Sequence, residues 1–261
     1  SDLVGASFGR SFFILDDYSP LRRISEELLQ KGAALFPVKK ALQYIPLRPI
    51  DSSEKGCLGD GFYAAANPPF GAVFTYYLRE PLKTGAEARH EEEKNLDKAG
   101  KPVPFPGWEK LRKEEMEDKP EIVLTISDES GQVVRRITGP GSKGIHRVAW
   151  NLRYPPIEPI ELEATEREEW DRKSEGPLVV PGRFTVSLAK KAEGVLTPLG
   201  EPQTFSVESL GLAALGEKDR GALLDFQKKA GELQRAMMGA GAAAREASES
   251  LRYMKKALTE T

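Results

Sequence analysis

The chain is poor in the residues from which most active sites are built. Its 261 residues include one cysteine, Cys57, and two histidines, His90 and His146. A single cysteine excludes an intrachain disulfide and any cysteine-based zinc or iron–sulfur site. Neither histidine lies near an obvious nucleophile in the sequence, so a Ser-His-Asp arrangement has no support. The sequence therefore names no catalytic residue, metal ligand or cofactor.

The chain also has little net charge and no long apolar run. The 38 Lys and Arg residues nearly balance 40 Asp and Glu residues, which leaves a charge of −2. No overall field of either sign attracts nucleic acid or an anionic membrane. No apolar run approaches the ~20 residues that span a bilayer, and the first residues lack the pattern of a signal peptide. We therefore expect neither nucleic-acid binding nor a membrane span.

Short strand-like segments dominate the middle of the chain. Apolar and polar residues alternate in three of them, at 121–137, 144–154 and 179–190. This period of two is typical of strands with one buried face. Trp150 is the expected central aromatic of their shared core, with Phe184 and Val186 beside it. The pattern predicts a mainly β fold, an immunoglobulin-like β-sandwich.

The period changes near the C-terminus, where apolar residues recur every three or four positions. The series is Leu223, Phe226, Ala230, Leu233, Met237, Ala240, Ala244, Ala247, Leu251, Met254 and Leu258. Five such repeats predict a coiled-coil-like helix, about 60 Å long if it is continuous from Lys218 to Thr259. Gly239 and Gly241 leave a helical hairpin open as the alternative. We expect the seven large side chains of the series to form a partner surface, for another helix or for a homo-oligomer.

Four polar features resemble sites but have simpler interpretations. Asp16 and Asp17 are adjacent on a strand, so their side chains point to opposite faces and suit a turn better than paired catalysis. His90 begins a solvated charge run with Glu91 to Glu93. His146 alternates in phase with Trp150, as a histidine at the edge of the core would. No base lies near Cys57 in the sequence, so it is not a predicted nucleophile.

Two tryptophans lie in polar insertions, Trp108 within 84–119 and Trp170 within 155–176. The first insertion is expected to be a solvated excursion, helical from Trp108 to Met116. If both indole rings lie exposed and coplanar, they can stack on sugar rings as a carbohydrate-binding module. The alternative is that each packs its insertion back onto the sandwich.

Three segments resemble a known family. SFGRSFFILDDYSPLR, from Ser7, resembles the end of the last blade in bacterial sortilin-like, BNR-repeat β-propeller proteins that are often labelled glycosyl hydrolases. ANPPFGAVFTYYL, from Ala66, is similar to the segment that opens their next domain. The β segments around Trp150 resemble the immunoglobulin-like repeat of flagellar hook-capping proteins, which also follows such propellers. Phe8 departs from the pattern, because the family commonly has His at this position.

The resemblance implies an accessory region of a longer, exported protein, extracellular or periplasmic. It suggests the following layout: last blade strands at 1–18, a helix and extended connector at 19–66, the sandwich at 67–210 with its two insertions, and a helical segment at 211–261. The expected role is non-catalytic, to brace the propeller and to mediate protein contacts. The alternatives are part of a glycoside hydrolase whose catalytic residues lie in the propeller, and a carbohydrate-binding module.

Overall fold

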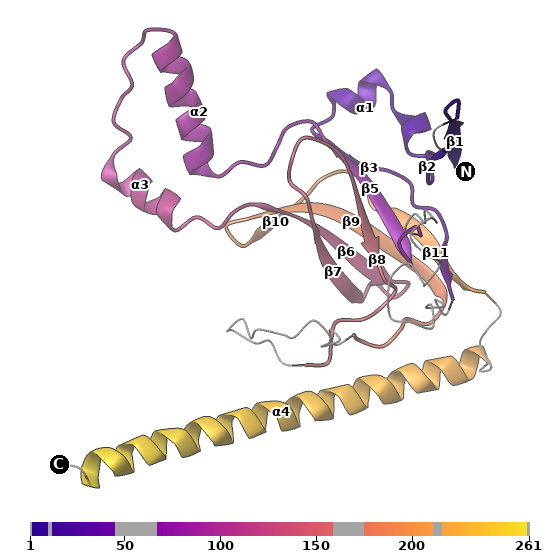
Figure 1. The fold of residues 1–261 in the computed structure, drawn as a ribbon, viewed down its shortest axis with the longest axis vertical. Coiled ribbons are helices and arrows are strands. Elements are labelled where there is room, and N and C mark those ends of the chain that lie inside the picture. The colour runs from indigo at the N-terminus through magenta and orange to yellow at the C-terminus, as the bar shows by residue number, and fades with distance from the viewer. Residues whose placement is uncertain (1, 10–11, 45–66, 159–174, 211–215, 260–261) are drawn as a thin grey trace. The chain divides into compact units, whose positions relative to one another are not determined.

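The computed structural model describes residues 2–9, 12–44, 67–158, 175–210 and 216–259 (Figure 1). The chain divides into two compact units. The first contains Ser1–Asn151 and Pro181–Leu212, and the second contains Leu152–Val180 and Ala213–Thr261. Cys57 and Trp170, both considered in the sequence analysis, lie outside the described residues, as does most of the second insertion.

Two sheets form the body of the first unit. The larger has the order β4-β11-β9-β6-β7, with β10 paired to β9, and the smaller has the order β3-β5-β8. All pairs are antiparallel except β4 with β11. The larger sheet comprises β4 (Ala41–Gln43), β6 (Glu121–Asp128), β7 (Val133–Gly139), β9 (Gly182–Ala192), β10 (Val195–Pro198) and β11 (Gln203–Ser209). The smaller comprises β3 (Ala33–Leu35), β5 (Ala72–Leu78) and β8 (Gly144–Trp150).

The two sheets face each other across an aromatic core. The ring of Trp150 on β8 lies 5.5 Å from that of Phe184 on β9 and 6.3 Å from that of Phe205 on β11. Phe74 on β5 completes the cluster at 5.4 Å from Phe205, in an edge-on contact. All four side chains are buried, as is Val186. The expected mainly β architecture and its core around Trp150 are confirmed.

A buried tyrosine ties the smaller sheet to the end of β7. The hydroxyl of Tyr76 on β5 donates a hydrogen bond of 2.6 Å to the carbonyl of Pro140. Its burial disfavours the charged phenolate and raises the pKa of Tyr76 to about 12. The phenol oxygen lies where a side chain on Gly139 would stand, so glycine is required there. His146 lies beside the Tyr76 ring at 5.3 Å and is half-buried, at the edge of the core.

The insertion at 84–119 is more ordered than a solvated excursion. It contains α2 (Gly85–Lys98) as well as the expected α3 (Trp108–Glu115). Arg89 on α2 joins them, because its Nε donates to both carboxylate oxygens of Glu114 at 3.0 and 2.9 Å. Its Nη1 also donates to Glu93 at 2.6 Å. These hydrogen bonds hold the pKa of both carboxyls below their usual range.

The expected helix and connector at 19–66 is only partly described. A short 3-10 turn at Leu21–Arg23 precedes α1 (Glu26–Gln30). The hydroxyl of Ser25 accepts a hydrogen bond of 3.2 Å from the Leu28 amide and so caps α1. Residues 45–66 of the connector lie outside the described part of the chain.

The second unit contains one uninterrupted helix, α4 (Glu217–Thr259), of 43 residues. At ~1.5 Å per residue it is about 64 Å long. The hairpin alternative is therefore wrong, and Gly239 and Gly241 lie inside the helix. Each glycine weakens a helix by about 1 kcal/mol, but neither reverses the chain unless a turn sequence supports it. Among the helices of the described residues, none is long and apolar enough to cross a membrane.

Candidate interaction surfaces

The β1–β2 hairpin exposes apolar side chains on both of its faces. It pairs β1 (Leu3–Ala6) with β2 (Phe12–Leu15) in an antiparallel register. Val4 pairs with Ile14 on one face, and Leu3 pairs with Leu15 on the other. The six large apolar side chains on the two strands are between 41 and 78 % exposed; they are Leu3, Val4, Phe12, Phe13, Ile14 and Leu15. A strand at a solvated surface normally has one polar face, so both faces of this hairpin lack cover.

Polar contacts hold the base of the hairpin in a fixed turn. The side chain of Arg147 on β8 donates a hydrogen bond of 2.7 Å to the backbone carbonyl of Asp16. The backbone amide of Asp17 donates to the carboxylate of Asp2 at 2.9 Å, and this bond lowers the pKa of Asp2. Asp17 itself has a φ of 46°, and its carboxylate accepts a hydrogen bond from the Ser19 hydroxyl at 2.7 Å. The two aspartates therefore serve a turn.

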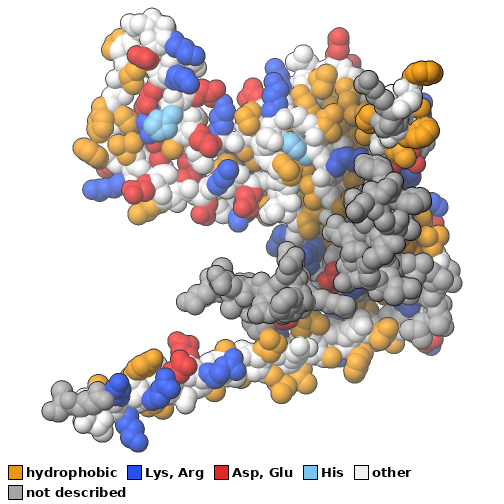
Figure 2. Space-filling view, viewed as in Figure 1, with side chains coloured by type: hydrophobic (Ala, Val, Ile, Leu, Met, Phe, Trp, Pro, Cys, Tyr) orange, Lys and Arg blue, Asp and Glu red, His pale blue; other side chains and the backbone are white. Residues whose placement is uncertain are grey.

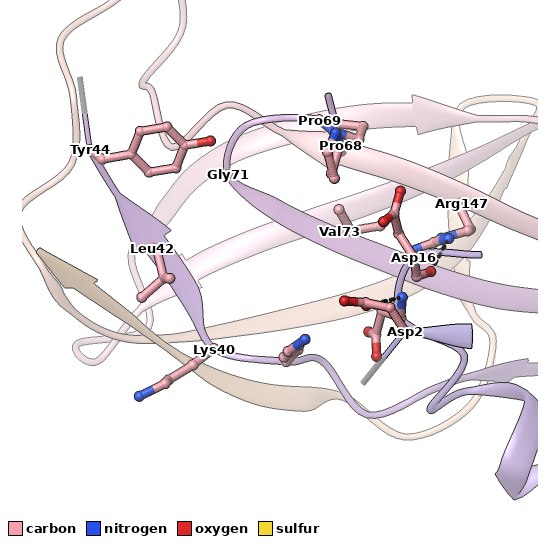
Figure 3. A pocket seen from close by; sticks show the side chains of 13 residues that line it. Asp2, Asp16, Lys40, Leu42, Tyr44, Pro68, Pro69, Gly71, Val73 and Arg147 are labelled. Atoms are coloured by element: carbon pink, nitrogen blue, oxygen red, sulfur yellow. Dashed lines mark hydrogen bonds between the residues drawn. The ribbon is translucent and has the colours of Figure 1, made fainter. Parts of the chain in front are cut away.

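A pocket of about 460 Å³ lies beside this turn (Figure 3). Asp2, Asp16 and Arg147 group at one side of it, and Tyr44 lies at the other. Lys40 points away from the centre and forms an ion pair of 2.9 Å with Glu208. The Asp2 carboxylate and the Arg147 guanidinium, at one side of the pocket, are thus engaged with the backbone of the turn.

The apolar stripe expected at the C-terminus lies exposed along α4. Its seven large side chains are between 42 and 82 % exposed; they are Leu223, Phe226, Leu233, Met237, Leu251, Met254 and Leu258. The four alanines of the series are exposed as well. Figure 2 shows hydrophobic side chains recurring along this helix between charged ones. In heptad terms these residues occupy positions a and d of five successive repeats, and Leu258 occupies position a of a sixth.

The opposite side of α4 is occupied by a segment of its own unit. Gly231 is buried, and its missing side chain leaves room for the side chain of Ile157. Arg235 donates hydrogen bonds to the carbonyls of Ile157 and Pro156 at 2.8 and 3.0 Å. The ammonium group of Lys228 lies 4.1 Å from the centre of the Tyr154 ring. These contacts use heptad positions b and f, which point away from a and d, so the segment leaves the stripe uncovered.

Trp108 begins α3 with its side chain exposed and its ring 5.3 Å from that of Phe105, in an edge-on contact. The packing of Trp108 against the sandwich, which was the alternative to sugar stacking, is thus absent. Trp170, the second tryptophan of the predicted sugar-binding pair, lies outside the described residues.

Of the remaining candidates, His90 lies exposed on α2, 3.4 Å from Glu93, in a surface charge cluster. No group of three or more metal-binding side chains occurs among the residues that the structure describes. Comparison with protein-family models, curated proteins and solved structures finds no match to this chain.

Proposed function

We propose that this chain is the non-catalytic accessory and interaction region of an exported β-propeller protein. In this role the β1–β2 hairpin belongs to a propeller sheet, and the two-sheet body braces that propeller. The helix α4 contributes a second contact surface. The proposal joins the family resemblance of three sequence segments to the two uncovered apolar surfaces of the molecule.

The single observation that carries the proposal is the two-sided exposure of the hairpin. Phe12 and Ile14 point to one face, while Phe13 and Leu15 point to the other, and all four are exposed. An isolated two-stranded hairpin is at best marginally stable, so these strands need more sheet beside them. The blades of a β-propeller are four-stranded sheets arranged around a central channel. Blades in such a ring flank one another, which would bury both faces of this hairpin.

The body fits a bracing role because of its construction. Two mostly antiparallel sheets enclose a continuous core, and the Arg147 contact to Asp16 fixes the base of the hairpin to that body. We propose that the body is an immunoglobulin-like module, with Trp150 as its core tryptophan. Such two-sheet modules occur in many cell-surface proteins as structural units. Export of the full-length protein is inferred from the family resemblance alone.

One second function has an observation in its favour. The exposed rings of Trp108 and Phe105 offer an aromatic surface of the kind that binds sugar rings. A carbohydrate-binding role therefore remains the alternative. A glycoside hydrolase role would place its catalytic residues in the propeller, and it would add no function to the residues described here.

The test is binding between this chain and a purified propeller domain encoded in the same gene. Phe13→Asp and Ile14→Asp place a charge on opposite faces of β2, and each is expected to weaken binding at least ~100-fold, since a buried unpaired carboxylate is costly. Val195→Asp is the matched control, because Val195 is an equally exposed strand residue outside the hairpin. A gene without a propeller, or binding that survives either hairpin variant, would refute the proposal.

A further inference from the structure

Large and small side chains follow one another along the α4 stripe in an order that fits a second copy of the same helix. Its large side chains lie towards the two ends of the helix, and its middle is the run Gly239 to Ala244, which contains only glycine and alanine. Two helices that cross at this run can approach closely, because no side chain larger than a methyl group separates their backbones. The close approach needs a partner that is also small at the crossing point.

An antiparallel pair centred on Ala242 provides such a match. Ala240 then faces Ala244 of the second copy, at the point of closest approach. Further out, both methionines of the stripe face an alanine. The facing pairs on each side of the centre are Met237 with Ala247, Leu233 with Leu251, Ala230 with Met254, and Phe226 with Leu258.

A parallel pair in register fits less well. Each residue of the stripe would then face its own copy, so Ala240, Ala244 and Ala247 would form three successive thin layers. The layers around Leu233 and Leu251 would be twice as bulky, and uneven layers leave voids that cost packing energy. In the antiparallel pair the side-chain volumes of successive layers are more even, because each methionine faces an alanine and is flexible enough to fill the space above it. It also sets the two helix dipoles in opposite directions.

The residues that flank the stripe favour the same arrangement. Heptad positions e and g border the contact in a coiled coil. In α4 the flanking residues from Ala222 to Ala257 are alanine, glycine, serine or glutamine, with Lys229 and Lys255 as the charged exceptions. In the antiparallel pair position e faces e and position g faces g. Lys229, at g, then lies near Ser250 and Ala257 of the partner helix, and Lys255, at e, lies near Gln227 and Gln234, so like charges do not meet on either flank.

The area of the stripe is sufficient for a dimer. Seven large side chains that expose roughly 100 Å² each, together with the alanines, present roughly 800 Å² per helix, which equals the ~800 Å² per partner of a standard interface. An apolar patch of this size is unusual on a soluble monomer. The segment at Pro156 and Ile157 occupies the other side of α4, so it does not compete for this surface.

We propose that α4 pairs in antiparallel orientation with α4 of a second copy of this chain, with Ala240 facing Ala244 across the two-fold axis. This inference rests on the proposed role of α4 as a contact surface and names its partner. It does not depend on the propeller, so the two tests fail independently.

The first experiment measures oligomeric state by size-exclusion chromatography with light scattering. The full chain is expected to be a dimer at micromolar concentration. Ala244→Asp should weaken the dimer at least ~100-fold, because it buries two unpaired carboxylates at the crossing point. Ala242→Asp is the matched control: it makes the same change two residues away at heptad position f, and it should leave the dimer intact. Both alanines are exposed in the single chain, so neither variant should affect its folding.

The second experiment measures orientation. A spin label is attached at Lys256→Cys in a Cys57→Ser background, and the distance between the two labels is measured by pulsed electron resonance. In the antiparallel pair, the two labelled positions are separated by about 42 Å along the helix axis. In a parallel pair they lie at the same height, about 20 Å apart or less. A monomeric chain, a dimer equally sensitive to both aspartate variants, or a short label distance would each overturn the proposal.

Discussion

The same side-chain deletion at two tryptophans should separate the core from the surface. Trp150 is 1 % exposed and lies between the two sheets, whereas Trp108 is 72 % exposed at the start of α3. Replacing either residue with alanine removes the same atoms. The difference between the two changes in the free energy of unfolding therefore reports the difference in burial.

The expected magnitude follows from the buried area. A buried tryptophan removes about 200 Å² from water, and at ~25 cal/mol per Å² its transfer is worth about 5 kcal/mol. Measured Trp→Ala changes in protein cores are about 3–5 kcal/mol, so we expect Trp150→Ala to lower the free energy of unfolding by about 4 kcal/mol. With a urea slope of ~2 kcal/mol/M, the unfolding midpoint should fall by about 2 M. Trp108→Ala should change the free energy of unfolding by less than ~0.5 kcal/mol.

The assay is urea unfolding followed by far-ultraviolet circular dichroism. Peptide-resolved hydrogen exchange on the same samples locates the effect, because α4 belongs to a separate compact unit and contributes its own helical signal. Faster exchange in β5, β8 and β9 is expected for Trp150→Ala. Equal midpoints for the two variants, or a loss of stability confined to α4, would show that the sheets do not close over Trp150.

Three further outcomes follow from single contacts. The raised pKa of Tyr76 means that its contribution to stability is fully present below pH 10 and is lost as the pH rises towards 12, so absorbance at 295 nm should show one tyrosine that ionises late. Tyr76→Phe should lower the free energy of unfolding in urea by about 1–2 kcal/mol, because it leaves the Pro140 carbonyl without this partner. Gly71→Ala should destabilise the body by more than about 1 kcal/mol in the same assay, because Gly71 has a φ of 105° and a methyl group there would overlap the Trp150 carbonyl; an unchanged midpoint would contradict this. Arg89→Met should loosen α2 from α3 and speed proteolysis between them while leaving the sheets intact. In the parent chain acid should do the same, since the pKa of Glu114 is lowered from its usual 4.5: its contribution is complete above that pH and is lost as the pH falls through the lowered pKa.

The sequence alone predicted the elements whose periods are long and clean. The alternation through Phe184 and Val186 placed a central strand, and the recurrence of three and four residues through α4 placed a helix near its observed bounds. It missed α2, although Thr84 and Glu87 form a capping box that is visible as Thr-x-x-Glu before the helix. The high charge of this insertion is equally typical of a solvated excursion, which is why the sequence predicted one.

The sequence predicts one of the two candidate contact surfaces and not the other. The stripe of α4 could be listed residue by residue, because a helix places every third or fourth residue on one side wherever it lies. The exposure of both hairpin faces could not be predicted, since FFIL is equally consistent with a strand buried inside the same chain.

Local pattern therefore determined the type of each major element and the identity of its apolar face, because strand and helix periods are properties of the backbone. Only the tertiary structure decided which of those faces meet one another. Burial depends on residues distant in sequence: Trp150 is enclosed because Phe184 and Phe205 contact it from the opposite sheet. Ile157 packs against the side of α4 that points away from the stripe, and the stripe itself stays exposed.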